Sequence, residues 1–216
     1  MRGGRLIFAT VLGAALAASG AARAETFFDA LASIFSGGGD DSAMFQGQVL
    51  YPDQVPRGRI VPGQFRRQMV RYNTGEQPGT IVIDTGAHFL YYVTGGGQAI
   101  RYGVGVGRTG FGWKGTVRVG GKAEWPAWRP PKAMIAREAK RGHRLPVYMA
   151  GGKGNPLGAR AIYLHGKGGD TGFRIHGTSE PWTIGLNVSS GCIRLVDGDV
   201  IDLYNRTRTG AKVIVM

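Results

Sequence analysis

The chain has 216 residues, of which 38 are glycine and one is cysteine, and its formal net charge is +13. A single cysteine excludes an internal disulfide and a multi-cysteine metal site, and glycines without a three-residue period exclude collagen. The positive charge predicts anionic surroundings. Because the chain has no zinc-finger spacing, basic heptad or aromatic RNA-binding signature, we expect no nucleic-acid partner and favour an acidic polymer or a membrane surface.

Residues 1–24 are predicted to be a secretory signal peptide. Two arginines near the start precede an apolar run over residues 6–18, and an A-x-A cleavage site covers residues 22–24. The alternative is a membrane anchor, but the run is short for a span and ends in small residues. Cleavage would start the mature chain at Glu25, remove three arginines and lower the formal charge from +13 to +10. We expect no stable membrane insertion after cleavage.

Residues 25–77 are predicted to be an N-terminal extension. Apolar residues over 27–35 have the spacing of a short amphipathic helix. Residues 36–42 have the composition of a linker, and several prolines after them argue against regular structure. Residues 65–70 are expected to pack on the edge of the domain that follows.

The remaining residues, 78–216, are predicted to form a mainly β domain. Short apolar runs bounded by turn residues predict strands at residues 80–84, 89–93, 99–106, 116–119, 161–165, 173–176 and 212–216. Residues 132–141 are predicted to be a helix, followed by a basic, glycine-rich loop over 142–158. A last helix is predicted to run from Asp197, as its cap, to about Arg206. Many short strands with two short helices indicate a β-sandwich or barrel.

Two of these runs, 89–93 and 99–106, are predicted to pair as a hairpin. At the end of the second run, Gly103, Gly105 and Gly107 alternate with larger residues. Side chains alternate between the two faces of a strand, so one face here is bare backbone. We therefore expect either close packing against that face or a bend in the strand.

The single cysteine, Cys192, follows Ser-Ser-Gly, and His176 ends a strand-like run sixteen positions upstream. An unpaired cysteine is a buried apolar thiol, half of an intermolecular disulfide or a nucleophile, and we favour the nucleophile. A histidine within reach would take the thiol proton, and a backbone carbonyl near Gly177 would fix its tautomer. Strand alternation puts Arg174 and His176 on the face opposite Ile175, so His176 need not be buried in the core.

The backbone N–H groups of Gly191 and Cys192 are expected to point toward one position, as in an oxyanion hole. His165, which also ends a strand, is the rival base, and Glu180 is the rival orienting group for the histidine. Four histidines without clustered carboxylates or cysteines predict no metal site, and no cofactor is predicted.

The residues around the cysteine resemble a known family. His-Gly-Thr at 176–178, followed after about a dozen residues by Ser-Ser-Gly-Cys-Ile-Arg at 189–194, looks like the signature of L,D-transpeptidases of the YkuD type. Segments 125–131 and 154–160 are also similar to segments of that family, especially its ErfK/YbiS-like branch. The resemblance covers residues 78–216. It is specific because several motifs agree, whereas a cysteine and a histidine alone occur in unrelated hydrolases.

The resemblance implies the family's mixed β-sandwich and a periplasmic enzyme acting on peptidoglycan. Cys192 would attack the carbonyl of the third residue of a tetrapeptide stem and release D-alanine, and an amine of a second stem would resolve the thioester to a 3→3 cross-link. His176 would be the general base, oriented by the carbonyl of Gly177. Arg194 would bind a stem carboxylate. Ser190 stands where many members carry a second histidine, so whatever that histidine does is in doubt here.

Alternatives remain for the contacts and for the acceptor. The candidate substrate contacts are Arg194, Ser190, Thr178 and Trp182. Arg194 has the alternative of an ion pair with Asp197 or Asp199, and Trp182 has that of packing. Water as acceptor would make the protein an L,D-carboxypeptidase, and an amine on an outer-membrane protein would make it an anchoring enzyme. A basic module that binds the cell wall without turnover is the remaining alternative.

Overall fold

The computed structural model describes residues 58, 60–109 and 111–216. The predicted signal peptide over 1–24 and the amphipathic and linker segments over 27–42 lie outside these residues. Within the described part of the chain, no helix has both the length and the apolar character needed to cross a bilayer.

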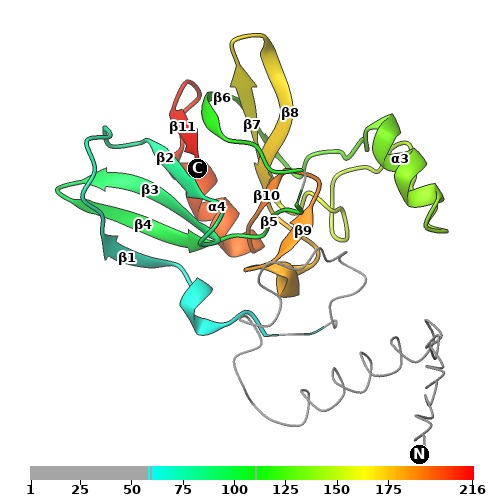
Figure 1. The fold of residues 1–216 in the computed structure, drawn as a ribbon, viewed down its shortest axis with the longest axis horizontal. Helices are drawn as coiled ribbons and strands as arrows, with labels where there is room; N and C mark the ends of the chain where they lie inside the picture. Colours follow the sequence, from blue (N-terminus) through cyan, green and yellow to red (C-terminus); the bar gives the residue numbers. More distant parts are fainter. Residues whose placement is uncertain (1–57, 59, 110) are drawn as a thin grey trace, which may run out of the picture. The chain divides into compact units, whose positions relative to one another are not determined.

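A nine-stranded sheet in the order β1-β4-β3-β2-β11-β6-β7-β8-β10 dominates the structure (Figure 1). Its strands are β1 (Gln68–Arg71), β2 (Ile81–Asp84), β3 (Phe89–Gly95), β4 (Gln98–Gly103), β6 (Gly115–Glu124), β7 (Arg160–Gly166), β8 (Gly169–His176), β10 (Ile193–Arg194) and β11 (Lys212–Val215). A second sheet pairs β5 (Val106–Gly107) with β9 (Asn187–Ser189). The pairs β2–β11, β8–β10 and β5–β9 are parallel and the others antiparallel, so the fold is mixed.

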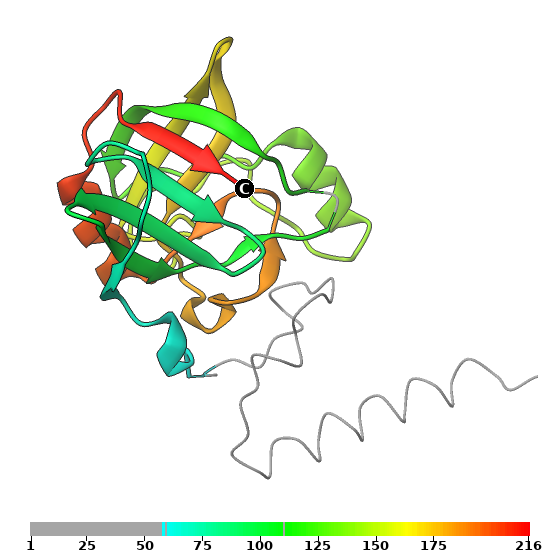
Figure 2. The same cartoon turned by 60° about the vertical axis from the view of Figure 1, so that its left-hand side comes forward.

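Two short helices accompany the sheets. They are α3 (Lys132–Ala139) and α4 (Asp197–Arg206), and single 3-10 turns occur at η2 (Gly63–Phe65) and η3 (Pro181–Thr183). Helix α4 contacts distant strands of the same sheet: Tyr102 of β4 donates to Asp202 at 2.6 Å, and Lys122 of β6 donates to two helix-end carbonyls at 2.7 Å. The sheet therefore curves around the helix (Figures 1 and 2). The predicted mainly β, barrel-like fold with two short helices is confirmed.

The core lies where this curved sheet meets α4. Its fully buried members come from strands of the large sheet and from α4, and include Ile81, Ile83, Leu90, Tyr102, Ile162, Leu164, Ile175, Leu203 and Val213. Removing each such aliphatic side chain from water contributes roughly 1.5–3 kcal/mol. The strand positions among them fall within the apolar runs that predicted the strands, so the burial explains the sequence pattern.

Helix α4 begins differently from the prediction. Its N-cap is Val196, which makes no side-chain capping bond, and Asp197 is the first helical residue. The expectation that Asp197 caps the helix is therefore wrong. Its Oδ1 accepts instead from the backbone N–H of Ala159 at 3.0 Å, which ties the helix start to the segment that enters β7. The carboxylate still lies in the first turn, where the helix dipole favours negative charge.

The alternating glycines meet close packing, as predicted. A Cβ on Gly103 would overlap Phe65, one on Gly105 would lie 2.9 Å from the carbonyl of Thr183, and one on Gly107 would lie 3.0 Å from the backbone of Gly191. The single strand predicted over 99–106 is broken, however, because β4 ends at Gly103 and β5 joins the second sheet. This break carries the chain from the large sheet toward the cysteine loop.

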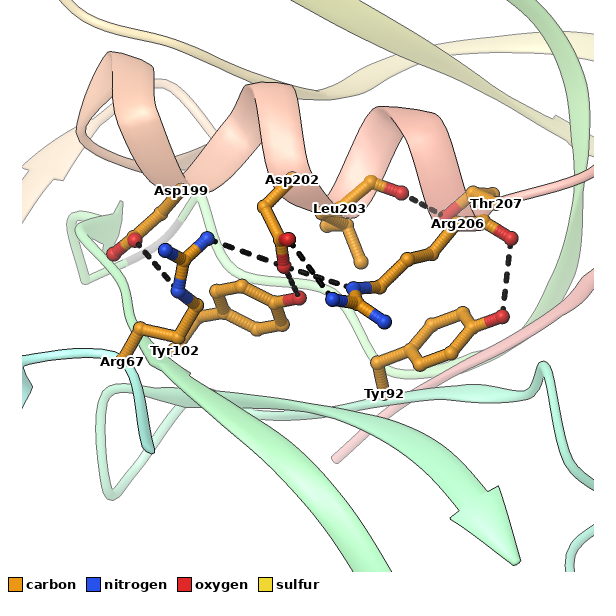
Figure 3. Close-up of polar contacts among 8 residues, drawn as sticks. All are labelled: Arg67, Tyr92, Tyr102, Asp199, Asp202, Leu203, Arg206 and Thr207. Carbon is orange, nitrogen blue, oxygen red and sulfur yellow. Dashed lines mark hydrogen bonds and ion pairs between the residues drawn. The ribbon is translucent and has the colours of Figure 1, made fainter. Parts of the chain in front are cut away.

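The segment before β2 packs on the domain edge, which confirms the expectation for residues 65–70. Strand β1 pairs with β4 as the outermost strand, and the Phe65 side chain is 3% exposed. Arg67 lies 3.2 Å from Asp202 and 3.7 Å from Asp199 of α4 (Figure 3). Asp202 also accepts from Arg206 at 2.9 and 3.0 Å, so this network joins the edge segment to the helix.

Candidate active site

His176 is the last residue of β8, and both neighbouring strands hold it in place. It lies opposite Ala161 of β7 and, in the parallel ladder, opposite Arg194 of β10. The side chain is 4% exposed and thus buried. It nevertheless lines a pocket and is not part of the apolar core.

The imidazole is oriented by the next residue. Nδ1 of His176 lies 2.5 Å from the carbonyl oxygen of Gly177. A carbonyl only accepts, so Nδ1 carries the proton and the lone pair is on Nε2. The rival orienting group, Glu180, pairs with Arg194 instead.

Gly177 has no room for a side chain. A Cβ there would overlap Asp197 Oδ1 and lie 3.0 Å from the backbone nitrogen of Ala159. Gly158, with φ +62°, is packed equally closely against the backbone of 177–178. The segment 154–160, noted in the sequence for its family resemblance, thus packs directly against the turn that follows His176.

Cys192 lies on the loop between β9 and β10. In the parallel register, Ile193 is opposite Ile175, so Cys192 precedes β10 beside Arg174. Because side chains alternate along a strand, Cys192 and Arg194 emerge on one face of β10, next to Arg174 and His176 on β8. Cys192 is partly exposed, and it lines the same pocket as His176.

A serine hydroxyl shapes the cysteine loop. Ser189 Oγ donates to the carbonyl of Cys192 at 2.6 Å and accepts from the N–H of Gly191 at 3.1 Å. The expectation that Gly191 donates its N–H into an oxyanion hole is therefore not met in this conformation. Gly191 has φ +105°, and a Cβ on it would lie 2.8 Å from the carbonyl of Phe111. Only glycine fits this tight, left-handed position.

Burial sets the protonation of the pair. Burial raises the pKa of the Cys192 thiol above its usual value, although a backbone hydrogen bond from Arg174 and the charges of Arg174 and Arg194 oppose the shift. Burial and the charge of Arg194 lower the pKa of His176 to about 3, against the bond to Gly177. At neutral pH the resting site therefore holds a neutral thiol and a neutral imidazole.

The pocket around the pair has a volume of about 930 Å³ and a positive lining. Its charged members are Arg108, Arg129, Arg137, Arg141, Arg174 and Arg194 against Glu138 and Glu180. Six arginines and two glutamates favour an anionic ligand, and a concave site between sheet and helix favours one of peptide size.

Arg194 faces this pocket while paired with a carboxylate. Its Nη1 donates to Glu180 Oε2 at 2.8 Å, so the predicted alternative partners, Asp197 and Asp199, are not its partners. Thr178 supports the pair from behind, because its Oγ1 accepts from the N–H of Glu180 at 3.0 Å. Thr178 itself is 5% exposed and is not among the described residues that line the pocket.

Ser190 brings two arginines to the cysteine loop. Its Oγ accepts from Arg137 of α3 at 2.9 Å and from Arg108 at 3.4 Å. Neither arginine was predicted to be a site residue. The charge total was the only signal, and it did not say which residues converge.

Two other predicted residues lie elsewhere. Trp182 is in η3, and His165 packs against Gly120 of β6; among the described residues, neither lines the pocket. His143 does line it and lies 3.5 Å from Glu138. Within the described ranges, no three His, Cys, Asp or Glu side chains gather as a metal site.

A β-rich domain with a single cysteine and a buried histidine in one pocket defines a class of candidate cysteine enzymes. The family model of the YkuD L,D-transpeptidase catalytic domain matches residues 78–215. The chain belongs to this family.

Curated relatives agree with the family. The chain is 35% identical over 140 residues to "Probable L,D-transpeptidase YcfS" of Escherichia coli K12, a match that covers 63% of this chain and 43% of that protein. It is 31% identical over 163 residues to "Probable L,D-transpeptidase YbiS" of the same strain, covering 74% and 50%. The chain therefore spans about half the length of the curated relatives it matches.

One solved structure has a higher identity. A Brucella melitensis protein described as a probable carnitine operon oxidoreductase is 48% identical, with 73% of this chain and 96% of that chain covered, at a TM-score of 0.49. That description belongs to the Brucella protein, whereas the family of the present chain rests on the family model and the curated relatives.

Proposed function

We propose that this protein is a peptidoglycan L,D-transpeptidase with Cys192 as its nucleophile. The observation that carries the proposal is that a lone cysteine and an oriented, neutral histidine line the same arginine-rich pocket. Cys192 attacks the carbonyl of the third stem residue, and the terminal D-alanine leaves. The resulting thioester passes to an amine of a second stem, which gives a 3→3 cross-link.

The neutral pair implies that proton transfer accompanies bond formation. As Sγ bonds to the carbonyl carbon, Nε2 of His176 takes the thiol proton, and Gly177 holds the Nδ1–H throughout. The imidazolium then gives that proton to the nitrogen of the leaving D-alanine as the C–N bond breaks. In the second half, the incoming amine loses a proton to Nε2 and attacks the thioester, and the proton returns to Sγ as the C–S bond breaks.

The charge of the pocket supports a stem peptide as the substrate. A tetrapeptide stem carries several carboxylates, and six arginines line the pocket. Arg194, beside His176 in the ladder, is proposed to bind one of them by exchanging or sharing its partner Glu180. Contacts of Thr178 and Trp182 with the substrate stay predictions.

The proposal extends to the location and organisation of the protein. Residues 1–24 are proposed as a cleaved signal peptide, 25–77 as an extension and 78–216 as the catalytic domain, with the mature protein in the periplasm. The high positive charge suits an acidic cell-wall polymer.

The test uses purified protein and tetrapeptide muropeptides. Wild-type protein is expected to release D-alanine and to gain the mass of the acyl group, whereas Cys192→Ala does neither. Undiminished D-alanine release by Cys192→Ala would refute the assignment. The products identify the acceptor: dimers indicate a second stem, tripeptides indicate water and an L,D-carboxypeptidase, and stems bound to outer-membrane proteins indicate an anchoring enzyme. Binding without any turnover would indicate the non-catalytic module.

A further inference from the structure

The Ser190 hydroxyl receives two guanidinium groups beside the nucleophile. Nη2 of Arg137 donates to it at 2.9 Å and Nη2 of Arg108 at 3.4 Å. Ser190 is two residues before Cys192, and all four residues line one pocket. The three polar side chains come from α3, from the loop after β5 and from the loop after β9, so the fold itself assembles this cluster.

An aromatic ring holds the two arginines together. The ring centroid of Phe111 is 4.9 Å from the guanidinium carbon of Arg108 and 5.0 Å from that of Arg137. Arg108 is 3% exposed, and its backbone N–H donates to the carbonyl of Ser189 at 3.0 Å. A cation–π contact stabilises each charge by roughly 0.5–2 kcal/mol. The two guanidinium groups are thus held in place by their contacts with Phe111 and by the burial of Arg108.

The cluster differs from the other arginines next to the cysteine. Arg174 makes two bonds of 2.7 Å to Asp170, and Arg194 makes one of 2.8 Å to Glu180. At Ser190 the acceptor shared by two positive groups is a neutral hydroxyl. Within the part of the chain that the structure describes, the carboxylate contact of Arg137 is longer, with its Nε 3.4 Å from Glu138. A carboxylate placed between two converging guanidinium groups is attracted by both charges.

We propose that Arg108, Arg137 and Ser190 form a carboxylate-binding subsite beside Cys192. A carboxylate has two oxygens, so it accepts a guanidinium bond on each side while the hydroxyl of Ser190 donates to it. The subsite orients a stem peptide by one of its carboxylates. The existence of the subsite follows from this cluster alone, and the identity of the carboxylate rests on the proposed function.

The first test reads the subsite through the thiol, without turnover. Cys192 is alkylated with iodoacetate, which is an anion, and with iodoacetamide, which is neutral. The ratio of the two rates cancels changes in thiol pKa. We expect Arg137→Ala to lower this ratio about fivefold, the effect of losing one nearby charge. Arg118→Ala, an exposed arginine of β6, is the matched control and leaves the ratio unchanged.

Two additions separate binding from a diffuse charge effect. Ser190→Asp places a carboxylate between the arginines, so it is expected to lower the ratio as Arg137→Ala does. N-acetyl-D-alanine is expected to protect Cys192 from iodoacetamide in the wild type and not in Arg137→Ala, whereas its amide protects neither. An equal ratio in all variants, or equal protection by acid and amide, would overturn the proposal. Arg108 is left intact because it is buried.

The second test identifies the carboxylate. Tetrapeptide stems are prepared with the terminal D-alanine carboxylate or the side-chain carboxylate of the diamino acid converted to an amide. Arg137→Ala is expected to lower kcat/KM about 10- to 100-fold on the unmodified stem, and to have no effect on the stem whose bound carboxylate has been masked. An equal loss on every stem contradicts the subsite. If the wild type processes no stem, the proposed function fails, and the alkylation ratio still decides the subsite.

Discussion

His176 is expected to make the folded domain sensitive to acid. Its pKa is lowered from 6.5 to about 3 in the folded protein, first by burial and second by the charge of Arg194. In the unfolded chain the pKa returns to about 6.5. Between these two values the unfolded chain binds a proton that the folded chain does not. The free energy of unfolding therefore falls as the pH falls through 6.5, and this contribution is lost fully near pH 3.

The size of this loss follows from the shift. Each pH unit between the two pKa values changes the free energy of unfolding by about 1.4 kcal/mol. From pH 7 to pH 4.5 the expected loss from His176 is thus roughly 2.5 kcal/mol, which is a large part of the 5–15 kcal/mol typical of a domain. His88, whose pKa burial also lowers, adds a loss of the same sign.

Urea unfolding of the wild type and of His176→Gln at both pH values isolates the effect. Glutamine does not titrate, whereas the carboxylates and His88 titrate in both proteins and cancel in the comparison. The wild type is expected to lose roughly 2.5 kcal/mol more than His176→Gln between pH 7 and 4.5. Equal losses would show that the resting imidazole is not held neutral by burial, and would refute the neutral-pair mechanism.

Three further predictions follow from the same structure. Alkylation of Cys192 by iodoacetamide should have an inflection above pH 9, because burial raises the pKa of the thiol; an inflection below 8 contradicts this. Phe65→Ala should lower the free energy of unfolding in urea by about 3–5 kcal/mol, and Met69→Ala, 54% exposed, by less than about 0.5; equal losses contradict it. Gly177→Ala should reduce D-alanine release at least about tenfold because its Cβ overlaps the α4 carboxylate, whereas Gly198→Ala, with nothing within 4 Å, should not.

Local pattern was enough to predict most of the fold. The apolar runs at 80–84 and 161–165 correspond to β2 and β7. Each strand buries apolar side chains in the same core, so its burial is visible as a local sequence pattern. The second sheet was not predicted, since β5 and β9 are two and three residues long and lie about eighty positions apart. The prediction that Asp197 caps the last helix was wrong for a related reason, because the partner of its carboxylate, Ala159, is 38 positions away.

In the candidate site, too, the residues that are close in sequence were predicted and those far apart were not. His176, Gly177 and Cys192 fall within one short stretch, where spacing and chemistry are legible together. Arg108 and Arg137 are 82 and 53 positions from Ser190, so no local pattern connects them to the cysteine loop. Their convergence depends on the turn after β5 and on the placement of α3.

The neutrality of the pair has one main cause. Arg194 and Arg174 stabilise a thiolate on Cys192, but the same charges destabilise an imidazolium on His176. For the ion pair formed by a Cys192 thiolate and a His176 imidazolium, these two effects oppose each other. The arginines therefore do not determine how much of this ion pair is present. Burial disfavours both charged partners and therefore decides in favour of the neutral state. A substrate carboxylate bound beside Cys192 would offset the positive charge that acts on the thiolate and on the imidazolium. The equilibrium between the neutral and the ionised pair would therefore stay nearly unchanged. The thiol must then become a nucleophile in the step that moves its proton, and the pocket arginines contribute by orienting the substrate.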